Sequence, residues 1–467
     1  MANCSSTLNV ANDAELLSYI INQDPVLKAE LPLPKQGESI KPYGELISSN
    51  ERFRNAFVNI CNLIGLTVIK RNAWEDPWDF TERGTIRWGQ SVREIILDLV
   101  KAHDYNAVLD TPQYALANYV PNAFQYIHDI NFQKFYCSTT SDDQLAMAFD
   151  TEGGLFDFID AVISMNYESF VYDRYQINKY MLARRILNGT ITPSYISGYA
   201  GMTPRQRTAS MKAVSNKMAF RSPNYNPAGL RKATKFDDQI LIMNTDFEAD
   251  FSTDVMATSF FRDEADFRAR LRLVDGFGNL DDERLTETLG NAFVPLEDTE
   301  VTALNAIPAV LISREWFMDY SYAFNTDSGM RETEFFNPMT LRNNHFLHAW
   351  ECFSTSPFEN ATVFTATAPS ITSVTVSPST ANALEGSKVV LGATVVTAGY
   401  ANQAVEWEVT TGDDYATVSA DGVVSISSDI DFDGSASVTV VVTATSIFDD
   451  NKTGTCTITV IDPDYTE

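Results

Sequence analysis

The sequence predicts an α+β body built around one very long helix, followed by an all-β C-terminal domain. The chain has 467 residues, of which 44% are hydrophobic and 12% aromatic, enough for two or three separate cores. The segment 155–187 contains neither glycine nor proline, and residues 370–467 alternate apolar and polar side chains. These three observations set the fold class, and each predicted element follows from a local pattern.

The long helix is predicted over 155–187. Apolar side chains recur there at steps of three and four residues, which is the period of a helix face: Phe156, Ile159, Ile163, Tyr167, Phe170, Ile177 and Met181. Gly153 and Gly154 precede the segment, and Asn188 and Gly189 follow it as a natural stop. Such a helix would be about 50 Å long.

The C-terminal domain is predicted to begin after a stretch of small residues at 365–370. Beyond it, apolar residues alternate at period two, as in Val405, Trp407 and Val409, and glycine or aspartate turns separate the alternating segments. Six or seven short strands in this length predict a β-sandwich with Trp407 in its core. The domain contains only one cysteine, Cys456, so the antibody-type disulfide between sheets is excluded.

Four segments of this domain resemble bacterial immunoglobulin-like domains of the second group. They are Ile371–Pro378, Val405–Trp407, Ala416–Ser419 and Asp421–Val424. The resemblance covers nearly all of 370–467 and implies an immunoglobulin-like sandwich.

An extended two-stranded excursion is predicted near the N-terminus. Strands at 66–72 and 85–88 flank a polar, aromatic stretch at 73–80. A lone hairpin cannot bury several tryptophans on itself, and exposed aromatics at this density indicate contact with another chain. The candidates for an inter-subunit contact are Trp74, Trp78, Phe80, Arg83 and Trp88. The alternative is a hairpin that folds back on its own domain.

The overall charge restricts the partners. Lys and Arg number 34 against 62 Asp and Glu, for a formal net charge of −28. So acidic a surface repels phosphate backbones and anionic lipid, which argues against general nucleic-acid or membrane binding, although a local basic region could break that rule. No apolar stretch is long enough to cross a bilayer, and the first residues show no signal peptide, so we expect folding in a cytoplasm. The five scattered cysteines form no C-x-x-C pair.

One segment breaks the acidic pattern. From Lys179 to Lys235 the chain has eleven basic residues and no acidic one. They are Lys179, Arg184, Arg185, Arg205, Arg207, Lys212, Lys217, Arg221, Arg231, Lys232 and Lys235. The segment could face nucleic acid without sequence preference, pair with acidic surfaces of identical neighbours, or be a solvated face without a partner.

Catalytic patterns are missing from the sequence. It has no phosphate-binding G-x-x-x-x-G-K loop, no G-x-S-x-G elbow and no H-E-x-x-H. His345 and His348, near Glu351 and Cys352, fit a strand that points the two imidazoles to opposite faces. Asp429–Gly434 begins like a calcium loop, but the residue at its twelfth position is Val440 instead of Glu. We therefore predict a protein without enzymatic activity, cofactor or metal.

A series of short segments, in order along the chain, resembles the major capsid proteins of small tailed phages of the phi-29-like (podovirus) type. They are Ile64–Arg71, Gly89–Ile96, Leu241–Asp250, Asp254–Met256, Val274–Phe277, Ala309–Met318, Asn337–Pro338, His348–Trp350 and Glu359–Phe364. The acidic stretch from Asp281 to Glu300 looks like an insertion in that pattern. The chain is thus similar to this family over about residues 50–460.

The resemblance implies an HK-97-like capsid fold with five parts. These are an N-terminal arm at 1–60, an extended loop at 61–100, a peripheral domain at 101–190 and 310–366 with a spine helix at 155–187, an axial domain at 191–309, and the immunoglobulin-like domain at 367–467. It implies subunits that form hexamers and pentamers of an icosahedral or prolate head around double-stranded DNA. Expected partners are the chain itself, a scaffolding protein, a portal and the packaged DNA, with a possible host-surface contact through the immunoglobulin-like domain and no cofactor. Lysine–asparagine cross-linking, known for some relatives of this fold, is not expected here.

Two other functions remain open from the sequence. The first is a surface adhesin or carbohydrate-binding protein, because immunoglobulin-like domains are common in such proteins. The absence of a recognisable signal peptide argues against it. The second is an uncharacterised enzyme, against which the missing catalytic patterns argue.

Overall fold

The structure is a computed structural model. It describes residues 76–87, 91–100, 120–141, 154–254, 270–323, 330–337, 342–432 and 435–462, with some isolated positions elsewhere. Most of the predicted N-terminal arm, the predicted strand at 66–72, Trp74 and Trp88 lie outside the described residues.

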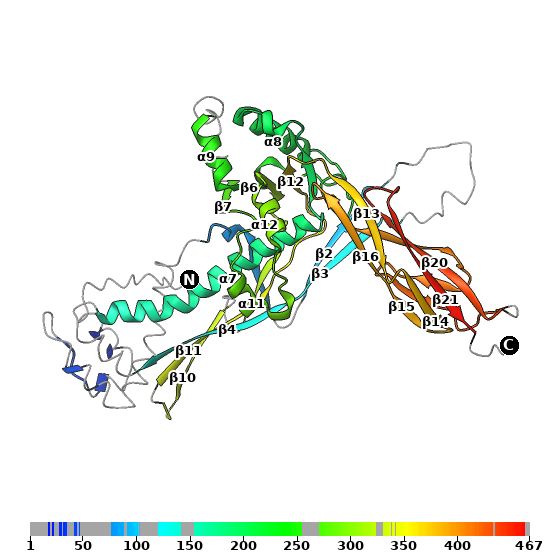
Figure 1. Ribbon diagram of the computed structural model, residues 1–467. Helices are drawn as coiled ribbons and strands as arrows, with labels where there is room; N and C mark the ends of the chain where they lie inside the picture. Colours follow the sequence, from blue (N-terminus) through cyan, green and yellow to red (C-terminus); the bar gives the residue numbers. More distant parts are fainter. Residues whose placement is uncertain are drawn as a thin grey trace, which may run out of the picture.

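Helix α7 (Gly154–Leu187) crosses the body from end to end (Figure 1). The prediction of a long helix at 155–187 is confirmed, because no residue in that segment interrupts the backbone hydrogen bonds. The helix ends at Leu187, and Gly189 follows with a φ of 66° in the left-handed region that favours glycine. Phe170 and Ile177 pack into one core, and Leu182 and Ile186 into the next, so the helix joins two cores.

The first sheet lies against the N-terminal half of α7. Its strands are β1 (Glu82–Arg87), β9 (Asp319–Ala323), β11 (Arg342–Cys352), β10 (Met330–Asn337) and β4 (Phe132–Ser141). Strand β11 is central and pairs antiparallel with β4 and β10. Leu347 and Ala349 of β11 point toward α7 and pack with Phe170. Strand β1 pairs with β9 in parallel.

A second sheet forms the middle layer of an α/β domain. Its strands, in order, are β5 (Thr192–Tyr195), β12 (Ala361–Thr365), β8 (Ala309–Ser313), β6 (Gln239–Asn244) and β7 (Leu271–Val274). Every residue of β8 and β12 is buried, as expected for strands covered on both faces.

Helices cover both faces of this sheet. Ile240 and Ile242 of β6 pack with α7 and with Leu304 of α12 (Asp298–Asn305). Leu241 and Met243, which alternate with them, belong to the opposite core with α8 (Pro204–Met218) and α9 (Thr245–Asp254). The short helix α11 (Asp282–Leu289) packs on α7. In Figure 1, α8 and α9 lie above the sheet, and α7, α11 and α12 lie below it.

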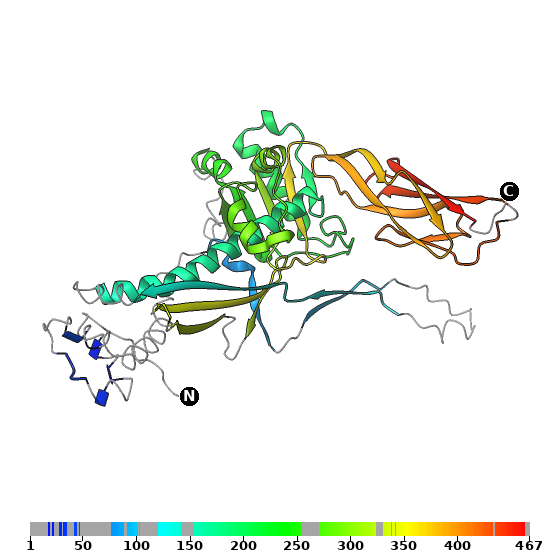
Figure 2. The same ribbon diagram turned by 60° about the horizontal axis from the view of Figure 1, so that its bottom comes forward.

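The two-stranded projection of this protein differs in place from the predicted one. Strands β2 (Val92–Leu97) and β3 (Ala123–His128) pair antiparallel and extend away from the body (Figure 2). The predicted return strand at 85–88 instead falls largely within β1, which joins the first sheet. Strand β2 thus pairs with a strand outside the loop range predicted at 61–100, and residues 61–75 and 88–90 of that range lie outside the described residues.

The C-terminal domain is entirely β among the described residues. Strands β14 (Thr380–Leu384), β21 (Thr453–Ile461), β20 (Ser437–Ser446) and β17 (Val405–Thr411) form one sheet. The pair β13 (Ser370–Ser377) and β16 (Gly392–Ala398) and the sheet β15 (Lys388–Val390), β19 (Val423–Ile426), β18 (Ala416–Val418) complete it. Their inward side chains form one core, against which Trp407 packs.

The C-terminal domain is docked on the α/β domain. The Tyr400 hydroxyl donates a hydrogen bond to the carbonyl oxygen of Ala303 at 2.7 Å, and the ring packs against the core of the α/β domain. A Cβ atom added to Gly189 would lie 2.3 Å from the carbonyl oxygen of Ala401. The two backbones therefore meet at a contact that only glycine permits.

Candidate functional site

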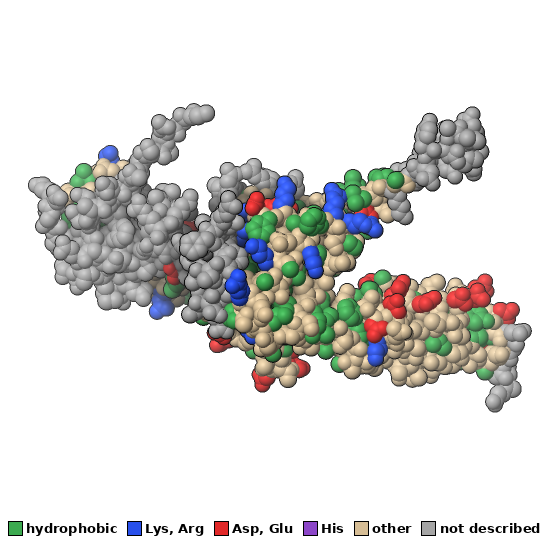
Figure 3. Space-filling view, turned by 90° about the horizontal axis from the view of Figure 1, so that it is seen from above, with side chains coloured by type: hydrophobic (Ala, Val, Ile, Leu, Met, Phe, Trp, Pro, Cys, Tyr) green, Lys and Arg blue, Asp and Glu red, His purple; other side chains and the backbone are tan. Residues whose placement is uncertain are grey.

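The β2–β3 projection exposes large apolar side chains. Ile95 and Leu97 are each 62% exposed, Ile127 is 46% exposed and Val120 at the start of the β3 segment is 82% exposed. Figure 3 shows hydrophobic side chains along this projection. A two-stranded ribbon has no second layer against which to bury them, so the surface fits contact with another chain.

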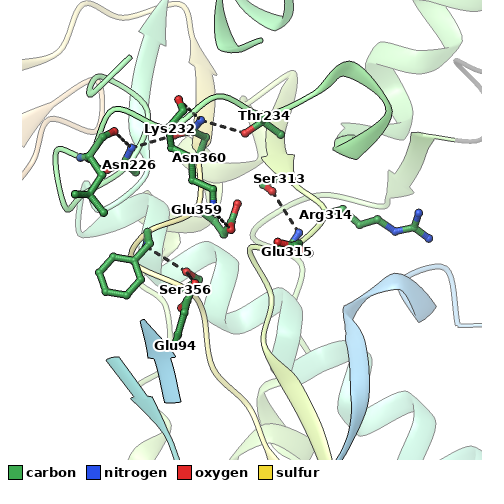
Figure 4. A network of polar contacts seen from close by, with 12 residues as sticks. Glu94, Asn226, Lys232, Thr234, Ser313, Arg314, Glu315, Ser356, Glu359 and Asn360 are labelled. Atoms are coloured by element: carbon green, nitrogen blue, oxygen red, sulfur yellow. Dashed lines mark hydrogen bonds and ion pairs between the residues drawn. The ribbon is translucent and has the colours of Figure 1, made fainter. Parts of the chain in front are cut away.

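A buried histidine fixes the base of the projection. His128 is 1% exposed, and its Nδ1 lies 2.8 Å from Ser354 Oγ. Its Nε2 lies 3.3 Å from Glu94 Oε2, and the hydroxyl of Ser356 donates to Glu94 Oε1 at 2.8 Å. Because Glu94 is on β2 and His128 on β3, this network ties both strands to the segment 354–356 of the body. Figure 4 shows Glu94 and Ser356 of this network.

The same connecting segment continues into a second polar network. Lys232 Nζ forms an ion pair with the buried carboxylate of Glu359. The side-chain amide of Asn360 donates to Lys232 O and to Thr234 Oγ1, each at 3.1 Å, and Asn226 donates to Asn360 Oδ1 at 3.0 Å. Figure 4 shows Asn226, Lys232 and Thr234, from the segment after α8, meeting Glu359 and Asn360, which directly precede β12. Lys232 therefore holds the fold together and is not a free surface charge.

A largely buried group of charged side chains surrounds Arg174 of α7. Arg174 pairs with Asp76 at 3.2 Å and with Glu82 at 3.0 Å. Asn178, one turn further on, donates to Asp319 Oδ2 at 2.7 Å. Burial raises the pKa of Asp319 to about 7, although hydrogen bonds from Asn178 and Thr81 oppose the shift.

Glu351 on β11 lies in the same region. Burial raises its pKa to about 8, against the lowering effect of a hydrogen bond from Ser321 and the charge of Arg174. Its Oε2 accepts this hydrogen bond at 2.9 Å. Two carboxyl groups with raised pKa thus lie where the first sheet meets the long helix.

The aromatic contact candidates prove to be core residues where the structure describes them. Trp78 is fully buried, and Phe80 is 7% exposed. The Trp78 ring lies 5.5 Å from that of Tyr175 and 5.7 Å from that of Phe317. The prediction that Trp78 and Phe80 contact another chain is therefore wrong, and the alternative, packing on their own domain, holds for both.

Arg83 is likewise directed inward. Its Nε donates to the carbonyl oxygen of Phe317 at 3.1 Å, and its Nη2 donates to that of Arg314. These bonds hold β1 against the segment between β8 and β9. The structure gives Arg83 an internal role in place of the predicted inter-subunit one.

The basic segment divides into internal and exposed members. Lys179 is buried and pairs with Asp275, Arg184 donates to Val294 O, and Arg207 lies over the ring of Tyr199 at 4.4 Å. Arg185 is half-buried. The exposed members are Arg205, Lys212, Lys217, Arg221, Arg231 and Lys235. Sequence reasoning could not separate the two groups, since both look alike in a charge count.

The histidines of β11 do not converge. His345 Nε2 lies 3.0 Å from Thr140 Oγ1, and His348 Nε2 lies 2.9 Å from Thr333 Oγ1, with odd spacing that points them to opposite faces. No group of three potential metal-binding side chains occurs among the described residues. Part of the Asp429–Gly434 stretch lies outside them. None of the described helices is both long and apolar enough to cross a membrane.

Comparison with known proteins identifies the family. Residues 30–365 match the model of the Phi29-like phage major capsid protein family. The chain belongs to this family. It is 26% identical over 429 residues to the major capsid protein of Bacillus phage PZA, covering 90% of this chain and 88% of that relative. It is 25% identical over 429 residues to that of Bacillus phage B103, with the same coverage.

A protein of this family is a structural subunit of a phage capsid, and the curated relatives bear that name. Family membership therefore confirms the resemblance found in the sequence and favours the capsid function over the adhesin alternative. Among solved structures, a chain from the capsid of Staphylococcus phage Andhra gives a TM-score of 0.48 at 13% identity, covering 64% of this chain and 86% of that chain.

Proposed function

We propose that the chain has an HK-97-like fold and assembles into hexamers and pentamers that close into an icosahedral or prolate head around double-stranded DNA. The β2–β3 projection is the observation that carries this proposal. Its apolar side chains are exposed in a single copy of the chain. They become buried only when a neighbouring subunit covers them. The long helix and the two sheets form the body that holds the projection in place.

In this proposal the projection lies over an adjacent subunit. The apolar contact is made by the exposed side chains of Ile95, Leu97 and Ile127, in place of the tryptophans predicted from the sequence. The network of Glu94, His128 and Ser354 sets the direction in which the projection leaves the body. A fixed direction reduces the ordering cost each time a contact forms in the shell.

The remaining partners follow from the proposed head. A scaffolding protein would guide curvature during assembly, a portal would admit the DNA, and the DNA would be held without sequence preference. The host cytoplasm would be the site of assembly and the virion the final location.

The C-terminal domain is proposed to be immunoglobulin-like and to project from the outer surface. Its separate β core, its sheets and the extended position of its far end in Figure 2 support this. Asp and Glu side chains lie along one edge of it in Figure 3. An acidic outer layer would keep heads apart in solution, and this domain is the part available for host-surface contact.

Electron microscopy of the expressed chain tests the proposal. We expect closed hollow particles, alone or with the scaffolding protein, and their loss when Ile95→Asp and Leu97→Asp are combined. The matched control is Leu384→Asp with Val390→Asp, two exposed apolar positions of the C-terminal domain. A wild-type chain that stays monomeric with its scaffold, or a projection variant that assembles like the control, would overturn it.

A further inference from the structure

The α/β domain carries a basic surface on the side of helix α8. We call this surface the basic face and define it by six exposed residues: Arg205, Lys212, Lys217, Arg221, Arg231 and Lys235. Figure 3 looks onto this side and shows Lys and Arg side chains spread over it. Within the described part of the chain, Lys217, Arg221 and Arg231 have no ion-pair partner.

The helices below the sheet carry the opposite charge. We call this surface the acidic face and define it by five exposed residues of α11, α12 and their connection: Asp282, Glu283, Glu287, Glu297 and Asp298. Arg284 is the one basic residue between 281 and 300, and it pairs with Asp173 of α7. Val294, 57% exposed, adds an apolar side chain to this acidic surface.

The two faces are back to back on one rigid domain. Alternate residues of β6 pack against the two helix layers, Met243 with α8 and Ile242 with α7 and α12. The basic face therefore points away from the acidic face of its own chain. A contact between them needs a second copy, and repetition of such a head-to-tail contact generates a ring when the rotation between copies closes and an open filament when it does not.

The basic face also contains an apolar hollow between α8 and the sheet. Its volume is about 90 Å³, and Met211, Leu241, Leu311 and Phe364 line it. Two cationic side chains, Lys212 and Arg270, are also part of its lining. A phosphate backbone has no group that fills an apolar hollow, whereas a protein surface that mixes carboxylates with an aliphatic side chain does.

We propose that the basic face of one subunit binds the acidic face of the next copy of the same chain within a capsomer. The proposal deepens the self-association on which the proposed function rests. Charge complementarity selects the occupant, with Val294 available for the apolar hollow. Packaged DNA fits the basic face less well, because exposed Asp237 and Asp238 adjoin Lys235 and the acidic helix α9 packs beside α8.

Charge reversal on the full chain tests this pairing. Lys217→Glu with Arg221→Glu makes the basic face repel its partner, and Glu283→Lys with Glu287→Lys does the same from the acidic side. We expect each pair to lower the yield of sedimenting particles by about tenfold or more. Mixing the two variant chains, or combining all four changes in one chain, is expected to restore particles, because each face again meets its opposite.

A control separates pairing from net charge. Glu406→Lys with Glu408→Lys reverses two exposed acids of the C-terminal domain and is expected to leave assembly unchanged. Thermal unfolding of each chain checks that it folds. Failure of both the mixture and the combined variant to restore particles overturns the proposal, as does a control that loses assembly equally. Normal assembly of the basic-face variant with reduced DNA retention assigns this face to DNA instead. Wild-type chains that fail to assemble would contradict the capsomer itself.

Discussion

The side-chain amide of Gln403, in the C-terminal domain, donates a hydrogen bond to the carbonyl oxygen of Leu187, the last residue of helix α7, at 2.8 Å. The final carbonyl groups of a helix have no partner within the helix itself. One of them is satisfied here by another domain, and Tyr400 of that domain strengthens the same junction by donating to the carbonyl oxygen of Ala303 on α12. The C-terminal domain thus helps to end the helix as well as extending from it.

This junction predicts a large effect of Gly189→Ala. The added Cβ would lie 2.3 Å from Ala401 O, and the φ of 66° disfavours any side chain. We expect a lower unfolding temperature and faster proteolytic cleavage between the domains. The matched control is Gly198→Ala, since Gly198 has a φ of 73° but open space around it. Equal effects of the two changes would mean that the domains do not press together at this point.

Trp78→Ala is predicted to destabilise the isolated subunit. The change empties a fully buried site that Tyr175 and Phe317 line, which costs about 3–5 kcal/mol of unfolding free energy. Denaturant unfolding of monomeric protein measures it. Tyr126→Ala, on the exposed β2–β3 projection, serves as the control and is expected to change monomer stability little. If the Trp78 variant were as stable as the wild type, the Trp78 ring would not be part of the subunit's core.

The stability of the subunit is predicted to fall as pH rises from about 4 to about 8. Asp319 and Glu351 have raised pKa values of about 7 and about 8 in the folded chain, because burial disfavours their charged forms. In the unfolded chain such groups titrate near pH 4. The folded state therefore holds more protons across this interval, and the free energy of unfolding decreases with increasing pH.

Asp319→Asn tests the origin of that slope. The amide keeps a side chain of similar shape but carries no titrating proton. We therefore expect the unfolding free energy of this variant to decline less steeply between pH 5 and pH 8 than that of the wild type, because one of the two groups no longer contributes to the slope. Asp298→Asn, on the exposed surface of α12, is the comparison. Parallel curves for Asp319→Asn and the wild type would exclude Asp319 as the source.

Glu94→Ala is predicted to loosen the β2–β3 projection without unfolding the body. The change removes the acceptor that Ser356 and His128 share and leaves the buried His128 without one partner, at a cost of about 1–3 kcal/mol. Hydrogen exchange of the β2 and β3 amides should accelerate, while exchange in β8 and β12 stays slow. Uniform acceleration throughout the chain would contradict a local role.

The sequence predicted elements whose pattern is continuous. Helix α7 could be placed because 155–187 lacks breaking residues, and the β-rich domain because its alternation persists over many strands. The β2–β3 projection was misplaced because its second strand begins at Ala123, far along the chain from Leu97. The sequence of neither strand indicates which other strand it pairs with.

The functional side chains were harder to assign, for a related reason. A tryptophan in a polar stretch looks the same whether it faces a neighbour or, like Trp78, enters its own core. The buried network of Asp76, Arg174 and Asp319 draws on segments widely separated in sequence, so no spacing rule could reveal it. The exposed and internal members of the basic segment can likewise be distinguished only from the tertiary structure, which shows which of them contact internal partners.

Helix α7 connects the C-terminal domain mechanically to the two cores of the body. One of its ends is fastened to a separate domain, and its middle is embedded in two cores. A force on the C-terminal domain must then pass along a stiff helix before it reaches the sheet beneath that helix, so deformation is shared by the whole subunit. Under pressure from inside, a shell of such subunits would therefore fail at the interfaces between subunits before the subunits themselves unfold.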